Sequence, residues 1–188
     1  ITDEVGQTEI DTFAVEQPTE ITPVYTITPV KCNGGTNGRS SVQVSGGTSG
    51  YAYNWNTGQT WKNSGNVAAG TYYLTVTDAN NCTLIDSTVI NEPSPLVISI
   101  DAITNVLCNG DATGEITVSA TGGIGAPYTF TWNTTPPFTG QTITGLVAGT
   151  YTVTATNAVG CVASTQATIT APAPLNITNI QIIYFFFK

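Results

Sequence analysis

Residues 32–55 read CNGGTNGRSSVQVSGGTSGYAYNW, and residues 108–132 read CNGDATGEITVSATGGIGAPYTFTW. The two stretches share the order of their glycines, their alternating apolar residues and their closing tryptophan, at an offset of 76 residues for the cysteines and 77 for the tryptophans. Self-similarity at a fixed period indicates that one structural unit is used more than once. We therefore expect two small units of roughly 75–80 residues rather than one large domain.

The repeat continues beyond the tryptophans. Gly70 aligns with Gly149, Tyr72 with Tyr151, and Cys82 with Cys161, and the offset grows to 79 residues. The length differences fall in turns rich in Gly, Pro and Asn, where insertions cost little free energy. In this alignment Ile143 takes the place of Trp61, beside the inserted residues KNSGN.

Apolar residues alternate with polar ones throughout both copies. The alternating segments are SVQVS, YAYNW, TYYLTVTD and STVIN in the first copy, and EITVSA, YTFTW, TYTVTATN and QATIT in the second. A period of two with abundant Val, Ile, Thr, Tyr and Trp is typical of half-buried strands, and the glycine-rich segments between them supply the turns. No helix is predicted. The fold class is therefore all-β, as tandem immunoglobulin-like β-sandwich repeats.

Proline-bearing joints divide the chain. We expect residues 1–20 to be the tail of a preceding repeat, 21–95 and 96–174 to be two β-sandwich repeats, and 175–188 to be the start of a following repeat. A short joint containing proline is stiffer than a Gly/Ser tether, so the units should form a rod. Continuing the period places Phe187 where a cysteine would be expected, and the residues IQIIYFFFK at 180–188 have no assigned role.

The composition limits the partners. The chain has twelve acidic residues and four basic ones, so its net charge is −8 and nucleic acid is not expected as a partner. No run of about 18 apolar residues is present, so no membrane span is expected in this segment. A surface made polar by Thr, Ser, Asn and Gly suits the extracellular space.

The four cysteines occupy equal positions in the two copies. Cys82 follows Cys32 by 50 residues, and Cys161 follows Cys108 by 53 residues. The spacing favours one disulfide in each unit, Cys32 with Cys82 and Cys108 with Cys161; the alternatives are a Cys82–Cys108 bond that locks neighbouring units, or reduced thiols. A disulfide would imply an oxidising, extracytoplasmic compartment. The chain has no His and no CxxC spacing, so neither zinc nor any other metal or cofactor is expected.

The aromatic residues have two interpretations. Trp55 and Trp132 each end an alternating aromatic strand, and we predict that they pack in the cores together with Tyr72 and Tyr151. Aromatic side chains also stack on sugars. Trp61 has no aromatic counterpart in the second copy and is the candidate for a glycan contact.

Catalytic and metal-binding motifs are weak. The residues DANN at 78–81 resemble a calcium loop, but the second copy has NAVG there and loses the carboxylate, so a hairpin turn explains both better. Histidine is absent, and no hydroxyl has a recognisable activating partner. We expect no catalytic residues and no enzymatic activity.

These elements together resemble a known family. The residues Cys-Asn-Gly, the turn SGGT or TGG, the strand aromatic-x-aromatic-x-Trp, the segments AAGTYYLTVTDANNC and VAGTYTVTATNAVGC, and the closing NEP or TAP are similar to the SprB-type repeat of Bacteroidetes surface proteins. The resemblance covers nearly all of residues 21–174. Its strongest part is Gly-Thr-Tyr at 70–72 and at 149–151.

The resemblance implies an extracellular, cell-surface location and a role in adhesion. Repeats of this family form long arrays in very large adhesins, including the gliding-motility adhesin that gives the family its name, and are exported by the type IX secretion system. This chain would then be a stalk or filament segment whose partners are neighbouring repeats, surface glycans, or the secretion and gliding machinery. Asp86-Ser87-Thr88 resembles the O-glycosylation sites of that phylum, which makes Ser87 a candidate. The alternative function is a pair of carbohydrate-binding modules.

Overall fold

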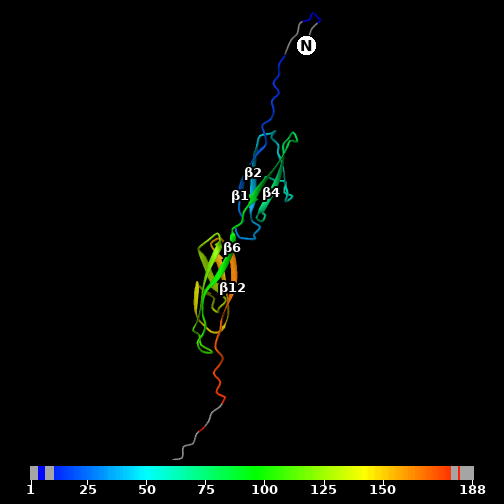
Figure 1. Ribbon diagram of the computed structural model, residues 1–188. Helices are drawn as coiled ribbons and strands as arrows, with labels where there is room; N and C mark the ends of the chain where they lie inside the picture. The colour runs from blue at the N-terminus through cyan, green and yellow to red at the C-terminus, as the bar shows by residue number, and fades with distance from the viewer. Residues whose placement is uncertain (1–3, 7–10, 179–181, 183–188) are drawn as a thin grey trace, which may run out of the picture. The chain divides into compact units, whose positions relative to one another are not determined.

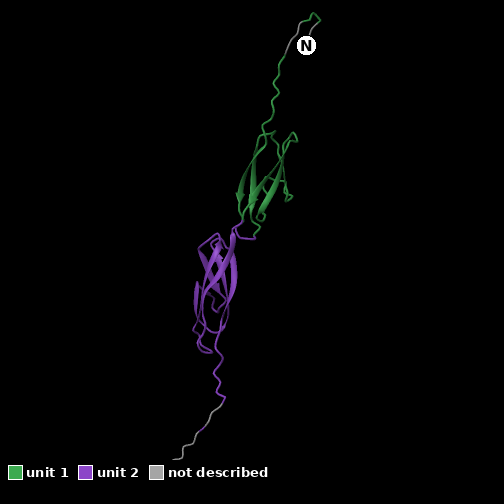
Figure 2. Cartoon of the chain, in the orientation of Figure 1, with its two compact units in different colours: residues 1–30, 35–91 green, residues 31–34, 92–188 purple. Residues whose placement is uncertain are grey.

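The computed structural model describes residues 4–6, 11–178 and 182. The chain forms two compact units, each built on its own core. Unit 1 comprises residues 1–30 and 35–91, and unit 2 comprises residues 31–34 and 92–188 (Figure 2). The short segment Lys31–Gly34, which lies within the first repeat of the sequence, therefore belongs to unit 2.

Among the described residues, unit 1 contains five antiparallel strands in two sheets (Figure 1). The first sheet pairs β1 (Thr22–Thr28) with β2 (Arg39–Ser45), and the second has the order β3 (Ala52–Trp55), β4 (Gly70–Thr77), β5 (Thr83–Ile90). Isolated bridges from Gly38 to Val67 and from Ser41 to Asn63 add a further segment beside β2. The segment between β3 and β4 thus completes the first sheet without forming a full strand.

Unit 2 repeats this arrangement, and most of its strands are longer. One sheet has the order β10 (Thr142–Leu146), β7 (Gly114–Gly123), β6 (Ser94–Thr104). The other has the order β12 (Val162–Ile169), β11 (Gly149–Asn157), β8 (Tyr128–Trp132), β9 (Phe138–Thr139). The strand β10 of unit 2 corresponds to the segment of unit 1 that forms the isolated bridges with β2.

Alternating burial explains the two-layer arrangement. Leu74 and Val76 of β4, and Val153 and Ala155 of β11, are at most 1% exposed, while the residues between them face away from the core. Successive side chains of a strand point to opposite faces, so each sheet has one apolar face to bury. The predicted fold class, tandem immunoglobulin-like β-sandwiches, is confirmed. The described residues include no helix that could cross a membrane.

A tryptophan lies at the centre of each core. Trp55 and Trp132 are both 1% exposed. Each indole N–H donates to a backbone carbonyl at 3.0 Å, that of Trp61 in unit 1 and that of Gly140 in unit 2. Trp61 is therefore the counterpart of Gly140, and its sequence alignment with Ile143 is wrong.

Two tyrosines brace the start of the central strands. The hydroxyl of Tyr72 donates to the carbonyl of Ala68 at 2.9 Å, and that of Tyr151 donates to the carbonyl of Val147 at 3.0 Å. Both rings are partly buried and pack against the core of their unit. A tyrosine that bonds to backbone four residues upstream is the tyrosine corner of immunoglobulin-like sandwiches.

The two cores differ at one pair of facing positions. Ile116 and Ile143 pair across β7 and β10 in unit 2 and are 0% and 3% exposed. Ser40 and Ser64, which are 0% and 1% exposed, take these places in unit 1, where the Ser64 hydroxyl accepts the Ser40 N–H at 2.9 Å. Unit 1 therefore buries two small polar side chains where unit 2 buries two large apolar ones.

The ends of the chain carry no assigned strand among the described residues 11–20 and 170–178. Their assignment to neighbouring repeats stays a prediction. Phe187 and most of the segment 180–188 lie outside the described residues.

Candidate disulfide linkage site

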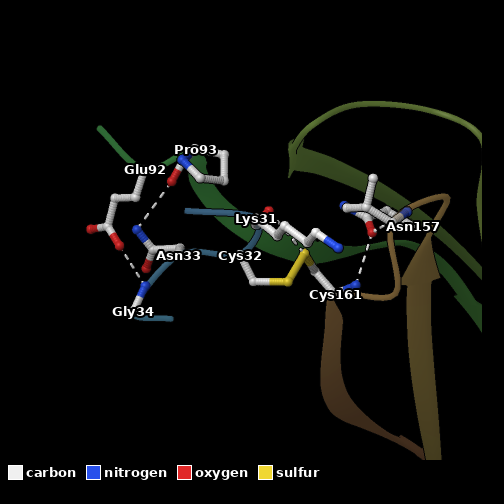
Figure 3. The surroundings of a disulfide bond; sticks show 9 residues. Lys31, Cys32, Asn33, Gly34, Glu92, Pro93, Asn157 and Cys161 are labelled. Carbon is white, nitrogen blue, oxygen red and sulfur yellow. Dashed lines mark hydrogen bonds between the residues drawn. A yellow bond between two sulfur atoms is a disulfide. The ribbon is translucent and has the colours of Figure 1, made fainter. Parts of the chain in front are cut away.

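A disulfide joins Cys32 to Cys161 (Figure 3). Its S–S distance is 2.07 Å, its Cα atoms are 5.6 Å apart, and its cysteines are separated by 129 residues in the sequence. It connects the first cysteine of the first repeat to the second cysteine of the second repeat. Both cysteines lie in unit 2, because that unit includes Lys31–Gly34.

The two pairings expected from the spacing are wrong. Cys82 and Cys108 are free and exposed, so neither Cys32–Cys82 nor Cys108–Cys161 forms, and the alternative Cys82–Cys108 bond is not formed either.

The two cysteines of a repeat lie at opposite ends of its sandwich. In unit 2, Cys108 follows the Thr104 end of β6, where Val106 donates to the carbonyl of Thr170. Cys161 lies in the turn before β12, eight residues from Ile169 at the other end of that strand. A strand of this length spans roughly 23 Å, and a disulfide requires Cα atoms within about 7 Å. The same argument applies to the first repeat. Cys82 precedes β5, whereas Val30, close to Cys32 in the sequence, donates to the carbonyl of Asn91 beyond the other end of β5.

One half of the linkage is a tight hairpin turn between β11 and β12. The side-chain oxygen of Asn157 accepts the N–H groups of Val159 at 3.1 Å and Cys161 at 2.9 Å. Gly160 has a φ of 87°, which favours glycine, and donates to the carbonyl of Asn157 at 3.0 Å. These bonds fix the direction in which Cys161, 6% exposed, presents its sulfur.

The other half is the loop that contains Cys32. The Asn33 side chain donates to the carbonyl of Pro93 at 3.1 Å, and the Gly34 N–H donates to a carboxylate oxygen of Glu92 at 2.6 Å (Figure 3). These two bonds hold the loop against the proline-bearing joint that leads into the second repeat. The joint between repeats is therefore part of the linkage site.

The hairpin half recurs in unit 1 around Cys82. The Asp78 side chain accepts the N–H groups of Asn80 at 2.9 Å and Cys82 at 2.8 Å, as Asn157 does for its own turn. Asn81, with a φ of 64°, takes the position of Gly160 and donates to the carbonyl of Asp78 at 3.0 Å. Asn is one of the few residues other than Gly that tolerate this conformation.

The loop half recurs in unit 2 around Cys108. The Asn109 side chain donates to the carbonyl of Pro172 at 3.1 Å, which is the same bond at the same distance as that from Asn33 to Pro93. Gly110 has a φ of 90°, where Gly34 has 72°. Cys82 therefore lies in the same kind of hairpin turn as Cys161, and Cys108 lies in the same kind of loop as Cys32.

Asp78 is a turn residue whose carboxylate is held by backbone donors. Its second carboxylate oxygen accepts the Thr48 N–H at 2.9 Å, so both oxygens are engaged by backbone donors. The N–H of Thr48, followed by those of Cys82 and Asn80, lowers the pKa of this carboxyl below its ordinary 3.8, although burial opposes the shift. No cluster of three potential metal ligands is present in the part of the chain that the structure describes.

The lowered pKa of Asp78 predicts an acid-sensitive unit 1. Because the folded state holds the charged form, the stabilisation is fully present above the ordinary pKa of 3.8 and is lost as the pH falls through the lowered folded value. Urea titrations followed by NMR, with the indole N–H signals of Trp55 and Trp132 reporting on the two units, should show a fall in the stability of unit 1 below about pH 4.

Unit 2 is a built-in control for this effect, because Asn157 occupies the position of Asp78 and does not titrate. Asp78→Asn should abolish this component of the acid dependence and should also weaken unit 1 at neutral pH. An unchanged acid profile in that variant would contradict the assignment.

The remaining candidates are single surface residues. Trp61 is 74% exposed. Ser87 is exposed on β5, and its N–H donates to the Asp86 carboxylate at 2.8 Å. Both stay predictions, Trp61 as a glycan contact and Ser87 as a glycosylation site.

The comparisons with known proteins agree with the repeat. The SprB repeat model matches residues 24–60 and again residues 100–136, so the same part of the unit is recognised twice at the offset of 76 residues. The resemblance seen in the sequence is confirmed at these two regions. No curated protein matches the chain.

Solved structures resemble the chain weakly. The three N-terminal domains of the outer capsid protein Hoc of bacteriophage RB49 match with 16% identity and a TM-score of 0.49; the match covers 81% of this chain and 59% of that one. The amphioxus IgVJ-C2 molecule matches with 16% identity and a TM-score of 0.32, covering 82% and 98%. Domains 4–9 of the surface layer protein SbsC match with 13% identity and a TM-score of 0.30, covering 86% and 32%. These likenesses are too weak to support an inference about function.

Proposed function

We propose, from the premise that this chain carries two SprB repeats, that it is a non-enzymatic structural segment of a large adhesin on the cell surface. The repeats act as spacers that carry adhesive regions away from the cell, and surface attachment or gliding is the process they serve. Neighbouring repeats are their principal partners. The location outside the cell and the export route are those that the family implies.

One observation carries this proposal: the disulfide joins the first repeat to the second rather than closing either one on itself. A bond inside one repeat would stabilise that repeat alone. A bond between cysteines of successive repeats adds a second covalent connection beside the backbone, which suits a spacer that is placed under tension. A cystine further suits an oxidising compartment such as the cell exterior.

Labelling of intact cells tests the location. Antibodies raised against residues 21–174 should label intact cells as strongly as permeabilised ones, and external protease should remove the signal. A periplasmic protein serves as the control and should be labelled only after permeabilisation. Labelling of the chain only in permeabilised cells would contradict a surface role.

An in-frame deletion tests the spacer role. Removing residues 94–172 leaves Pro93 followed by Ala173, so a proline-bearing joint is kept. We expect unchanged export and a graded loss of attachment, because the adhesive region would be displaced by only one repeat. Complete loss of attachment, or binding of the purified chain to a glycan array that Trp61→Ala abolishes, would show that the repeat itself is the binding module.

A further inference from the structure

We infer that Cys82 and Cys108 are the unpaired halves of two further linkages of the same kind. Cys108 takes the hairpin cysteine of a following SprB-type repeat, and Cys82 takes the loop cysteine of a preceding one. Each repeat is then bonded to both of its neighbours and never to itself. This inference rests on the tandem array of the proposed function and specifies how its members are joined.

The formed linkage shows what a complete site contains. The hollow around the disulfide is lined by three parts: the loop residues Cys32 and Asn33, the strand start at Pro95 and Leu96, and the hairpin residues Gly160, Cys161 and Val162. The loop belongs to the first repeat of the sequence, the hairpin belongs to the second, and Pro95 and Leu96 lie where the two repeats join. All of these residues lie in unit 2, and a complete site needs residues from two successive repeats of the sequence.

The hollow beside Cys108 holds the loop and the next strand start. Its lining includes Cys108, Asn109, Pro174 and Leu175, which are the counterparts of Cys32, Asn33, Pro95 and Leu96. No described residue takes the place of the hairpin. Leu107 and Leu175 are accordingly 83% and 94% exposed, whereas Leu96 is partly buried against the core of unit 2. The missing part is the one that a following repeat would supply.

The hollow beside Cys82 has the complementary composition. It is lined by Cys82 and Thr83 of the hairpin and by Glu20 and Ile21, which precede β1 as Pro95 and Leu96 begin β6. No loop cysteine lies among its lining residues. The missing part here is the one that a preceding repeat would supply. The two open sites therefore complement each other, one presenting a loop and the other a hairpin.

The chemistry is an ordinary two-electron oxidation. Two thiols form one S–S bond, and their two protons and two electrons convert an external disulfide oxidant into two thiols. The reaction proceeds by attack of a thiolate on a disulfide sulfur, so the attacking thiol must be accessible. Cys82 and Cys108 are both exposed and meet this condition.

A count of free thiols on chains of different length tests the inference. The oxidised chain should have two free thiols and a Cys32–Cys161 cross-link. A third repeat is added by fusing a copy of residues 94–188 directly after Pro172, which reproduces the Pro93–Ser94 joint. This adds two cysteines, yet the extended chain, refolded with a glutathione redox pair, should again have two free thiols. Peptic digestion at acid pH, where few thiolates are present to exchange disulfides, should yield a new cross-link from Cys108 to the added hairpin cysteine.

The outcomes separate the alternatives. Four free thiols in the extended chain would show that the added cysteines stay reduced, and no free thiols would show pairing within repeats or between Cys82 and Cys108; either result overturns the inference. Cys108→Ser in the extended chain should give three free thiols and leave the Cys32–Cys161 bond intact, while circular dichroism checks the fold. Surface labelling of cells is independent of the thiol count, so failure of the inference and failure of the proposed function are distinguishable.

Discussion

Pulling the oxidised chain from its two ends is expected to release almost none of the length stored in its two units. Tension entering at the N-terminus reaches Cys32, crosses the disulfide to Cys161, and leaves through β12. The 129-residue separation that the bond spans corresponds to roughly 430–460 Å of extended chain that force cannot reach. Only β1 and β12 among the strands lie in the path of the load.

Reduction should change this response completely. With the disulfide broken, both units lie in the path, and single-molecule force spectroscopy should record two unfolding steps, each of roughly 230–270 Å of contour length. The double variant Cys32→Ser/Cys161→Ser should behave like the reduced chain under all conditions. The matched double variant Cys82→Ser/Cys108→Ser should behave like the oxidised wild type. Two full steps from oxidised wild-type chain would rule out the linkage.

Unit 1 is expected to unfold well before unit 2. The difference arises at the facing core positions, where Ser40 and Ser64 replace Ile116 and Ile143. Burial of one isoleucine side chain contributes about 1.5–3 kcal/mol, so two such replacements should leave unit 1 roughly 3–6 kcal/mol less stable. The indole N–H signals of Trp55 and Trp132 in a urea titration of the reduced chain would report the two transitions separately.

A substitution in unit 2 should reproduce the weakness of unit 1. Ile143→Ser places the residue of unit 1 in the core of unit 2 and should cost roughly 3–5 kcal/mol, because it removes buried apolar volume and adds a hydroxyl. Ile124→Ser, at a residue of unit 2 that is 58% exposed, is the control and should change stability little. Equal midpoints for both units in the wild type would contradict this account of the cores.

The fold could be predicted because its determinants are local. Every strand expected from alternation is present, since a period of two reflects the two faces of a strand and needs no knowledge of distant contacts. The alignment of Trp61 with Ile143 is wrong because the segment around Trp61 lacks such a local pattern. In unit 1 residues 56–69 form isolated bridges with β2 and no regular strand, whereas the second copy forms the strand β10, so the sequence offers no alternation by which to align them.

The disulfide could not be predicted from spacing because spacing does not show at which end of a sandwich a cysteine lies. The end depends on how many times the chain crosses the sheets between Cys32 and Cys82, and the irregular segment 56–69 hides one crossing. The presence of a disulfide and the equivalence of the four cysteines were visible in the repeat. The pairing depends on which strand ends lie at the same end of a sandwich, and this is decided by contacts between residues far apart in the sequence.

The span of the disulfide also bears on chemical damage to the backbone. Cleavage of any one peptide bond between Cys32 and Cys161 leaves both fragments covalently attached, because the sulfur bridge closes a ring around every turn in that interval. Exposed turns are the preferred sites of proteolytic nicking, and both sandwiches place most of theirs inside this ring. A protease that cuts one such turn therefore opens the covalent ring but does not separate the chain into two molecules.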